Sequence, residues 1–199
     1  MKYFLVFALI LVLLGCTQQP DIVDNTNDYH THADDEYHTH VDFKVFLNNA
    51  QVDFNKTDYM SNEYEEHDES VHLHGFNPNV IHFHNEGITL QRFFNSSGIT
   101  FTSNCFEIGS EKYCESTNEK LLLYVNGSLE EEKNNYVPMD LDKILIYYGH
   151  GEPTERMFAS VTNEACIYSE KCDAPEGFII EPENCSISKP CVLPEGEHP

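Results

Sequence analysis

Basic residues are scarce in this sequence of 199 residues. It has 11 Lys and Arg against 34 Asp and Glu, which gives a formal net charge of −23 at pH 7. A field of this sign repels the phosphates of nucleic acids and anionic lipid headgroups, and it concentrates cations. We therefore expect no nucleic-acid-binding function. Solubility outside the cell or a saline habitat explains the acidity equally well.

The sequence also lacks the motifs of common catalytic sites. It contains no Gly-X-Ser-X-Gly nucleophile elbow, no phosphate-binding loop and no CXXC redox pair. Its carboxylates are numerous and scattered, so they do not single out an acid–base pair. We predict no catalytic residue and favour a non-enzymatic function. Residues 16–199 suffice for one domain with extensions, and not for a large multidomain enzyme.

The N-terminal apolar run is too short to cross a membrane as a helix. It extends from Tyr3 to Leu14 after a single lysine and ends in the letters LLGC. This ending resembles the bacterial-type lipobox, in which a signal peptidase cuts before a cysteine that carries a diacylglycerol. The resemblance implies a signal peptide over residues 1–15, lipid on Cys16, and anchoring at the outer face of the cell membrane or in the periplasm. An ordinary secretory signal or an uncleaved anchor are the alternatives, and each also places the mature chain outside the cytoplasm.

Six further cysteines follow Cys16. An even number in an exported chain predicts disulfides, although the sequence leaves their connectivity open. The segment CFEIGSEKYC has strand-like ends around a Gly-Ser turn, which favours a Cys105–Cys114 bridge. Two CX5C spacings favour Cys166–Cys172 and Cys185–Cys191. A zinc site of cysteines is the alternative, but these spacings are not the usual CX2C.

Composition divides the rest of the chain into three parts. Residues 16–36 are polar and are expected to form a flexible tether. Residues 37–149 carry the apolar patterns of one domain, and residues 150–199 form a Cys- and Pro-rich extension that we expect to be irregular and stapled by disulfides. A short repeat, YHTH-ADDE-YHTH, joins the tether to the domain.

Apolar periodicity predicts the elements of the domain. Alternating apolar residues over 41–47 predict a strand, followed by an Asn48-Asn49 turn and a short return strand. Residues 89–97 predict a helix with Thr89 as N-cap, a buried face of Leu90, Phe93 and Phe94, and an end at Gly98. Further strands are predicted in ITFTSNCFEI, in KLLLYVNGSLEEE before its Asn-Gly turn, and in DLDKILIYYG.

The order hairpin, helix, strand, strand, strand over residues 41–149 resembles the ubiquitin-like β-grasp fold. The resemblance implies an α+β domain, with one helix packed on a mixed sheet and a His-rich β-hairpin inserted in it. A cupredoxin-like sandwich of two antiparallel sheets is the alternative. Fold similarity of this kind assigns no function.

Histidines are the strongest functional signal. Eight of the 11 histidines fall in His-X-His pairs, namely His30 and His32, His38 and His40, His72 and His74, and His82 and His84. The stretch VHLHGFNPNVIHFH holds two of these pairs around a connector with Gly, Asn and Pro. Because alternate side chains of a strand share a face, a hairpin would gather its four histidines on one face and its apolar residues on the other.

These pairs predict a metal site on the outer face of the sheet. Neutral imidazole binds zinc and Cu(II), and neighbouring strands bring two pairs around one ion. We expect His72, His74, His82 and His84 to be ligands, assisted by His38 and His40, with the Asp42 carboxylate on the same face. The other reading is a polar or pH-sensitive surface. The tether pair could also bind metal, whereas we expect His67 to be a solvated loop residue.

Short stretches resemble known metalloproteins. HLHGF resembles the His-X-His-Gly signature of multicopper oxidases, and the His-X-His spacing is similar to that of copper-zinc superoxide dismutase. The sequence departs from the cupin pattern, which needs a Glu four or more residues after the pair, because Glu86 follows His84 by two. VIHFHNEG resembles the zinc-binding strand of α-type carbonic anhydrases, which implies His82 and His84 as ligands with His72 or His74 as the third. Each likeness covers fewer than ten residues and supports metal ligation only. The sequence thus predicts a lipid-anchored protein that captures or delivers zinc or copper; a metalloenzyme and an envelope scaffold with a protein partner are the alternatives.

Overall fold

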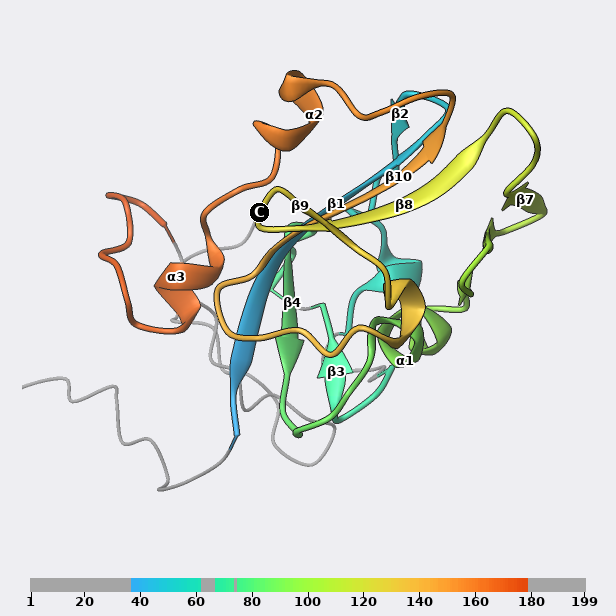
Figure 1. Cartoon of the computed structure of the whole chain (residues 1–199). Coiled ribbons are helices and arrows are strands. Elements are labelled where there is room, and N and C mark those ends of the chain that lie inside the picture. The colour runs from blue at the N-terminus through green and yellow to red at the C-terminus, as the bar shows by residue number, and fades with distance from the viewer. Residues whose placement is uncertain (1–36, 62–66, 74, 179–199) are drawn as a thin grey trace, which may run out of the picture. The chain divides into compact units, whose positions relative to one another are not determined.

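The computed structural model describes residues 37–61, 67–73 and 75–178, which form a mixed α/β domain (Figure 1). The signal peptide, Cys16, the tether pair His30 and His32, and the cysteines Cys185 and Cys191 lie outside the described residues, as does His74. No helix in the described ranges is long and apolar enough to cross a membrane.

The larger sheet has seven strands. They are β1 (Thr39–Leu47), β2 (Ala50–Gln51), β3 (Val71–His72), β4 (Val80–Phe83), β8 (Lys120–Val125), β9 (Ser128–Glu130) and β10 (Lys143–Gly149). Their order is β3-β4-β1-β10-β8-β9, with β2 paired to β1. The central pair β1 and β10 is parallel, and the other pairs are antiparallel.

The strand and turn predicted at residues 41–49 are confirmed. Strand β1 buries its alternate apolar residues, and Asn48 and Asn49 have φ values of 51° and 67°. Two successive positive φ values give the tight turn that suits the twist of a two-residue hairpin, and asparagine tolerates this conformation better than most residues. The return strand β2 then pairs with the end of β1.

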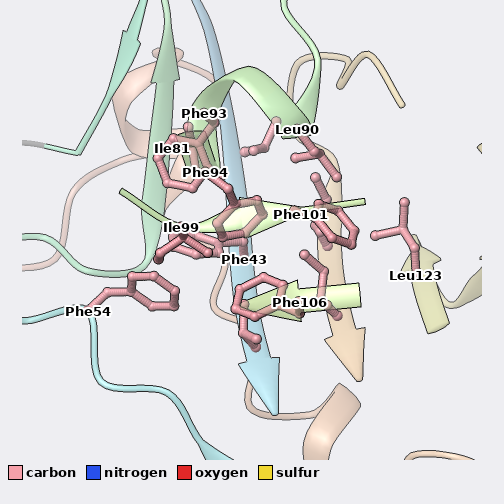
Figure 2. Packing of buried hydrophobic residues seen from close by; sticks show 14 of the residues in the cluster. Phe43, Phe54, Ile81, Leu90, Phe93, Phe94, Ile99, Phe101, Phe106 and Leu123 are labelled. Atoms are coloured by element: carbon pink, nitrogen blue, oxygen red, sulfur yellow. The ribbon is translucent and has the colours of Figure 1, made fainter. Parts of the chain in front are cut away.

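The predicted helix is confirmed as α1 (Leu90–Ser96). Thr89 caps it, since its hydroxyl oxygen accepts a hydrogen bond from the backbone N–H of Arg92. The buried face packs onto the sheet (Figure 2), where the Phe93 ring lies 5.5 Å from that of Phe43 and 4.9 Å from that of Phe94. A helix at this place contradicts the alternative of a cupredoxin-like sandwich.

A separate three-stranded sheet follows α1. Its strands are β5 (Thr100–Phe101), β6 (Cys105–Ile108) and β7 (Glu111–Cys114). The prediction of one continuous strand over residues 99–108 was wrong, because the Thr102 hydroxyl accepts a hydrogen bond from the backbone N–H of Cys105 and turns the chain there. Cys105 and Cys114 face each other across β6 and β7 and form the expected disulfide.

Short helical turns complete the described chain. They are the 3-10 segments η1 (Thr57–Tyr59) and η2 (Lys133–Asn135) and the helices α2 (Glu155–Phe158) and α3 (Ala165–Tyr168). The expected Cys166–Cys172 disulfide joins α3 to the segment that follows it. The described part of the extension beyond residue 149 is not an irregular tail: α2 packs Met157 on Phe46 and Tyr147, and α3 packs Ala165 on Val80.

Candidate metal centre

The registers of three adjacent strands bring the histidine pairs together. His82 on β4 faces His72 on β3 and His40 on β1, so the three residues form a row across the sheet. His38 and His84 form a second row, two residues along from His40 and His82. The pairing of Thr39 with Phe83 brings these two histidines together, and their ring centroids lie 4.7 Å apart. The predicted convergence of separate His-X-His pairs is therefore present for these five residues.

The five described imidazoles form a closed circuit. Successive ring centroids lie 4.7 Å apart for His38 and His84, 4.9 Å for His84 and His72, 6.4 Å for His72 and His82, 4.8 Å for His82 and His40, and 6.2 Å for His40 and His38. We call this set the histidine cluster. His40, His72 and His82 lie on β1, β3 and β4, which are paired in the sheet, while His38 directly precedes β1 and His84 directly follows β4.

The apolar residues of the hairpin occupy the opposite face, as strand parity predicts. Val71, Leu73, Ile81 and Phe83 belong to the main core together with Leu90 of α1. These side chains are at most 2% exposed. Core packing therefore fixes which face the histidines take, because a slip of one residue would bury imidazoles among the phenylalanines.

The predicted exposure of the site was wrong. His82 is 0% exposed, His40 3% and His72 8%, while His38 and His84 are partly exposed. Helix α3 covers this part of the sheet, and the Tyr168 ring lies 4.8 Å from that of His82 and 5.8 Å from that of His40. The cluster thus lies between the sheet and α3 and not on an open surface; Figure 1 shows α1 and α3 on opposite sides of β1 and β4.

Asp42, expected beside the histidines as a carboxylate, has a different role. It is 1% exposed and holds the start of α3. Its Oδ1 accepts hydrogen bonds from the Thr162 hydroxyl at 2.5 Å and from the backbone N–H of Glu164 at 2.8 Å. Its Oδ2 accepts one from the backbone N–H of Ala165 at 3.2 Å. Because these bonds satisfy N–H groups at the helix start, Asp42 anchors α3 and is not directed to the cluster as a ligand.

A hydrogen-bond relay orients His40. The Ser169 hydroxyl donates to Asp140 Oδ1 at 2.5 Å, so its oxygen accepts from His40 Nδ1 at 2.8 Å. Asp140 Oδ1 also accepts from the backbone N–H of His40. With its proton on Nδ1, a neutral His40 carries its lone pair on Nε2. Ser169 and Asp140 have no signal in the sequence, because only the fold brings them to the first strand.

A second anchor orients His72. Its Nδ1 lies 2.8 Å from the backbone carbonyl oxygen of Asp68, which can only accept, so His72 also carries its lone pair on Nε2. Arg92 fixes Asp68 through two bonds, from Nε at 3.0 Å and from Nη2 at 3.1 Å. Burial acts to raise the pKa of the Asp68 carboxyl, but the bonds from Arg92 and Ser70 outweigh it and hold this pKa below its usual value.

The connector of the hairpin is tied to α3. Asn77 Nδ2 donates to Glu164 Oε2 at 2.9 Å and to the Tyr168 hydroxyl at 3.2 Å, and Asn79 Nδ2 donates to the same Glu164 oxygen. Lys44 donates to Asn79 Oδ1. Burial lowers the pKa of Lys44, although the charges of Glu164 and Asp42 act to raise it. These polar contacts hold α3, which covers the histidine cluster, to the strands that carry the histidines.

Other donor groups are less suited to a metal. In the described ranges, one set of three has its ligand atoms within 4.8 Å of one another, namely Cys105, Glu107 and Cys114. Its two sulfurs are joined in a disulfide and cannot act as thiolates. The nitrogen atoms of the five imidazoles do not meet the same spacing, so ion binding requires the rings other than the anchored His40 and His72 to turn. His67 is half-buried, contrary to the prediction of a solvated residue, whereas His150 is exposed.

Comparisons of this chain with protein-family models, curated proteins and solved structures found no match.

Proposed function

We propose that this protein binds a divalent transition metal ion, zinc or copper, through the histidine cluster, with His74 of the same hairpin as a further ligand. The closed circuit of five imidazoles carries this proposal, since neighbouring rings lie 4.7 to 6.4 Å apart on three paired strands. Imidazole suits zinc and Cu(II), and ligand bonds near 2.0 to 2.1 Å come within reach of such rings after side-chain rotation.

The anchoring of two rings supports the same proposal. Histidines that bind metals usually donate their other N–H to a carbonyl, a carboxylate or a further polar group, which fixes the ring and its tautomer. His40 and His72 make such bonds through Nδ1, to Ser169 and to the Asp68 carbonyl. Their Nε2 atoms are therefore the expected ligand atoms.

The burial of the cluster favours capture or delivery of the ion over catalysis. A catalytic metal keeps a position open to water and substrate. His82 and His40 are at most 3% exposed beneath α3, which suits an enclosed ion. The net charge of −23 would draw cations towards the molecule. A metalloenzyme remains the alternative, and an exchangeable metal-bound water would distinguish it.

The location and the fold class complete the proposal. The LLGC sequence at the end of the N-terminal apolar run supports a lipid on Cys16, and hence a cell-surface or periplasmic metal-binding protein. We also infer a β-grasp-like arrangement. It is supported by the strand order β4-β1-β10-β8-β9, by the parallel pairing of β1 with β10, and by the position of α1 between β4 and β8 in the sequence. A β-grasp-like fold does not by itself assign a metal-binding function.

Calorimetric titration with Zn(II) and Cu(II) tests the proposal on full-length protein purified without a polyhistidine tag. We expect stoichiometric binding by the wild type and its loss in the double variant His72→Gln and His82→Gln. Glutamine is chosen because His82 is 0% exposed and alanine would leave a cavity. His150→Gln is the control, as His150 is exposed. Wild-type affinity in the double variant would contradict the proposal.

Binding of an envelope protein is a second candidate. In the described ranges, Phe76 is 74% exposed, Met139 66% and Leu129 50%, and a partner that covered these side chains would bury their apolar surface. This function requires no metal. Cross-linking in intact cells, compared between wild type and a Phe76→Ser and Met139→Ser variant, tests it; identical cross-linked products would contradict it.

A further inference from the structure

The Cys166–Cys172 disulfide closes a small loop that carries the two side chains covering the histidine cluster. Tyr168 and Ser169 both lie between the bonded cysteines. The Tyr168 ring packs 4.8 Å from His82, and the Ser169 hydroxyl accepts from His40 Nδ1 at 2.8 Å. The loop therefore couples a redox-sensitive bond to the orientation of His40.

The position of α3 over the histidine cluster depends on the disulfide and on other contacts, because this helix has only four residues. A helix this short is not stable by itself in water. Asp42 holds its start, while Asn77 and Asn79 hold Glu164. At its other end, the disulfide and the Ser169–Asp140 bond keep the chain in place. Loss of the disulfide should thus loosen the end that contacts His40 and His82.

The two sulfurs of this disulfide differ in their surroundings. Cys172 is exposed, whereas Cys166 is 8% exposed and its Sγ accepts a hydrogen bond from Asn163 Nδ2 at 3.1 Å. Cys172 is therefore the more accessible of the two residues to a thiolate from solvent. The Cys166 sulfur would be the leaving group, and the Asn163 amide would stabilise the thiolate that forms.

We propose that the Cys166–Cys172 disulfide is a redox lock on the metal centre; this inference rests on the proposed metal-binding function. With the disulfide formed, Ser169 and Tyr168 are held over the cluster and the ion is retained. An external dithiol attacks Cys172, forms a mixed disulfide and is then oxidised to its own disulfide. Two electrons and two protons pass to the protein, Cys166 and Cys172 become thiols, and the ion is bound less tightly.

The chain provides a matched control in its other described disulfide. Cys105 and Cys114 join β6 and β7 in the three-stranded sheet, which contains none of the cluster histidines. Removing this bridge should alter stability without altering metal affinity. A comparison of the two bridges thus separates a specific coupling from a general loss of stability.

The first experiment measures Zn(II) affinity by competition with a chromophoric chelator, using full-length, tag-free protein. We expect the Cys166→Ser and Cys172→Ser variant to bind about tenfold or more weakly than wild type, as for loss of groups that orient a ligand. The Cys105→Ser and Cys114→Ser variant should bind as wild type does. Equal affinities in all three proteins would overturn the redox lock but leave the proposed function intact. Absence of binding by the wild type would instead overturn the proposed function.

A second experiment needs no variant and so does not depend on the folding of a mutant. Coupling between two sites is reciprocal, so bound Zn(II) must oppose reduction of the disulfide that favours its binding. In wild-type protein equilibrated at a fixed ratio of reduced to oxidised dithiol, we expect saturating Zn(II) to lower the fraction of Cys166–Cys172 that is reduced, as read by alkylation and mass spectrometry. The reduced fraction of Cys105–Cys114 should stay the same. Equal reduced fractions of Cys166–Cys172 with and without Zn(II) would overturn the proposal.

Discussion

His40 and Ser169 lie 129 positions apart in the sequence, yet His40 Nδ1 is 2.8 Å from Ser169 Oγ. The first residue is on β1 and the second directly follows α3. Because Ser169 in turn donates to Asp140, the bond sets the tautomer of a buried imidazole of the histidine cluster. The C-terminal segment therefore contributes to the candidate site without supplying a ligand.

Replacing Ser169 by alanine should weaken metal binding. The Ser169→Ala variant loses the acceptor for His40 Nδ1, and loss of such an orienting partner typically lowers metal affinity by about 10- to 100-fold. Competition titration with Zn(II) measures the effect. The matched control is Ser160→Ala, whose hydroxyl donates to the Met157 carbonyl near α2. Similar affinities for the two variants would argue against an orienting role of Ser169.

Replacing Phe93 by alanine should cost about 3 to 5 kcal/mol of unfolding free energy. Phe93 is 0% exposed, and its ring contacts those of Phe43 and Phe94 between α1 and the sheet. Phe76→Ala is the control, since Phe76 is 74% exposed and should change stability by less than about 0.5 kcal/mol. Chemical denaturation followed by circular dichroism gives both values. A small change in unfolding free energy for Phe93→Ala would contradict a major role of this ring in core packing.

The Asp68–Arg92 pair should make part of the stability depend on acid pH. Since the pKa of Asp68 is held below its usual value of 3.8, the carboxylate stabilises the fold above that pH, and this stabilisation is lost as the pH falls through the lowered pKa. Arg92 is half exposed, so the contribution is about 0.2 to 1 kcal/mol. Denaturation of wild type and Asp68→Asn should differ at pH 7 and converge in acid. A difference that is constant with pH would contradict the assignment.

Replacing Cys16 by serine should release the protein from membranes. The LLGC ending predicts that Cys16 carries the lipid, and serine provides no thiol for its attachment. Fractionation of cells into membrane and soluble parts gives the result. If the Cys16→Ser protein sediments with membranes as the wild type does, another feature retains it.

The common face of the hairpin histidines was predictable from strand parity. In VHLH and VIHFH, histidines alternate with apolar residues. Because the apolar residues must face the core, the histidines must share the other face. The helix over residues 90–96 was predictable for a similar reason, since Thr89, the apolar spacing and Gly98 are local signals.

The position of helix α3 over the histidine cluster was not predictable from the sequence. Helix α3 has four residues and no long apolar period, and its position depends on Asp42, Asn77 and Asn79, which bond it from distant parts of the chain. Such long-range polar contacts leave no pattern in a single sequence. For the same reason, Ser169 and Asp140 could not be identified, and Asp42 was taken as a residue of the metal face.

Anomalous X-ray diffraction from crystals of the tag-free protein with Zn(II), recorded on both sides of the zinc absorption edge, tests the central claim most directly. The account predicts an anomalous peak between the β1–β4–β3 strands and α3, within bonding distance of at least three histidine nitrogens, including Nε2 of His40 or His72. A peak confined to acidic surface groups, or no peak near these histidines at saturating zinc, would contradict it.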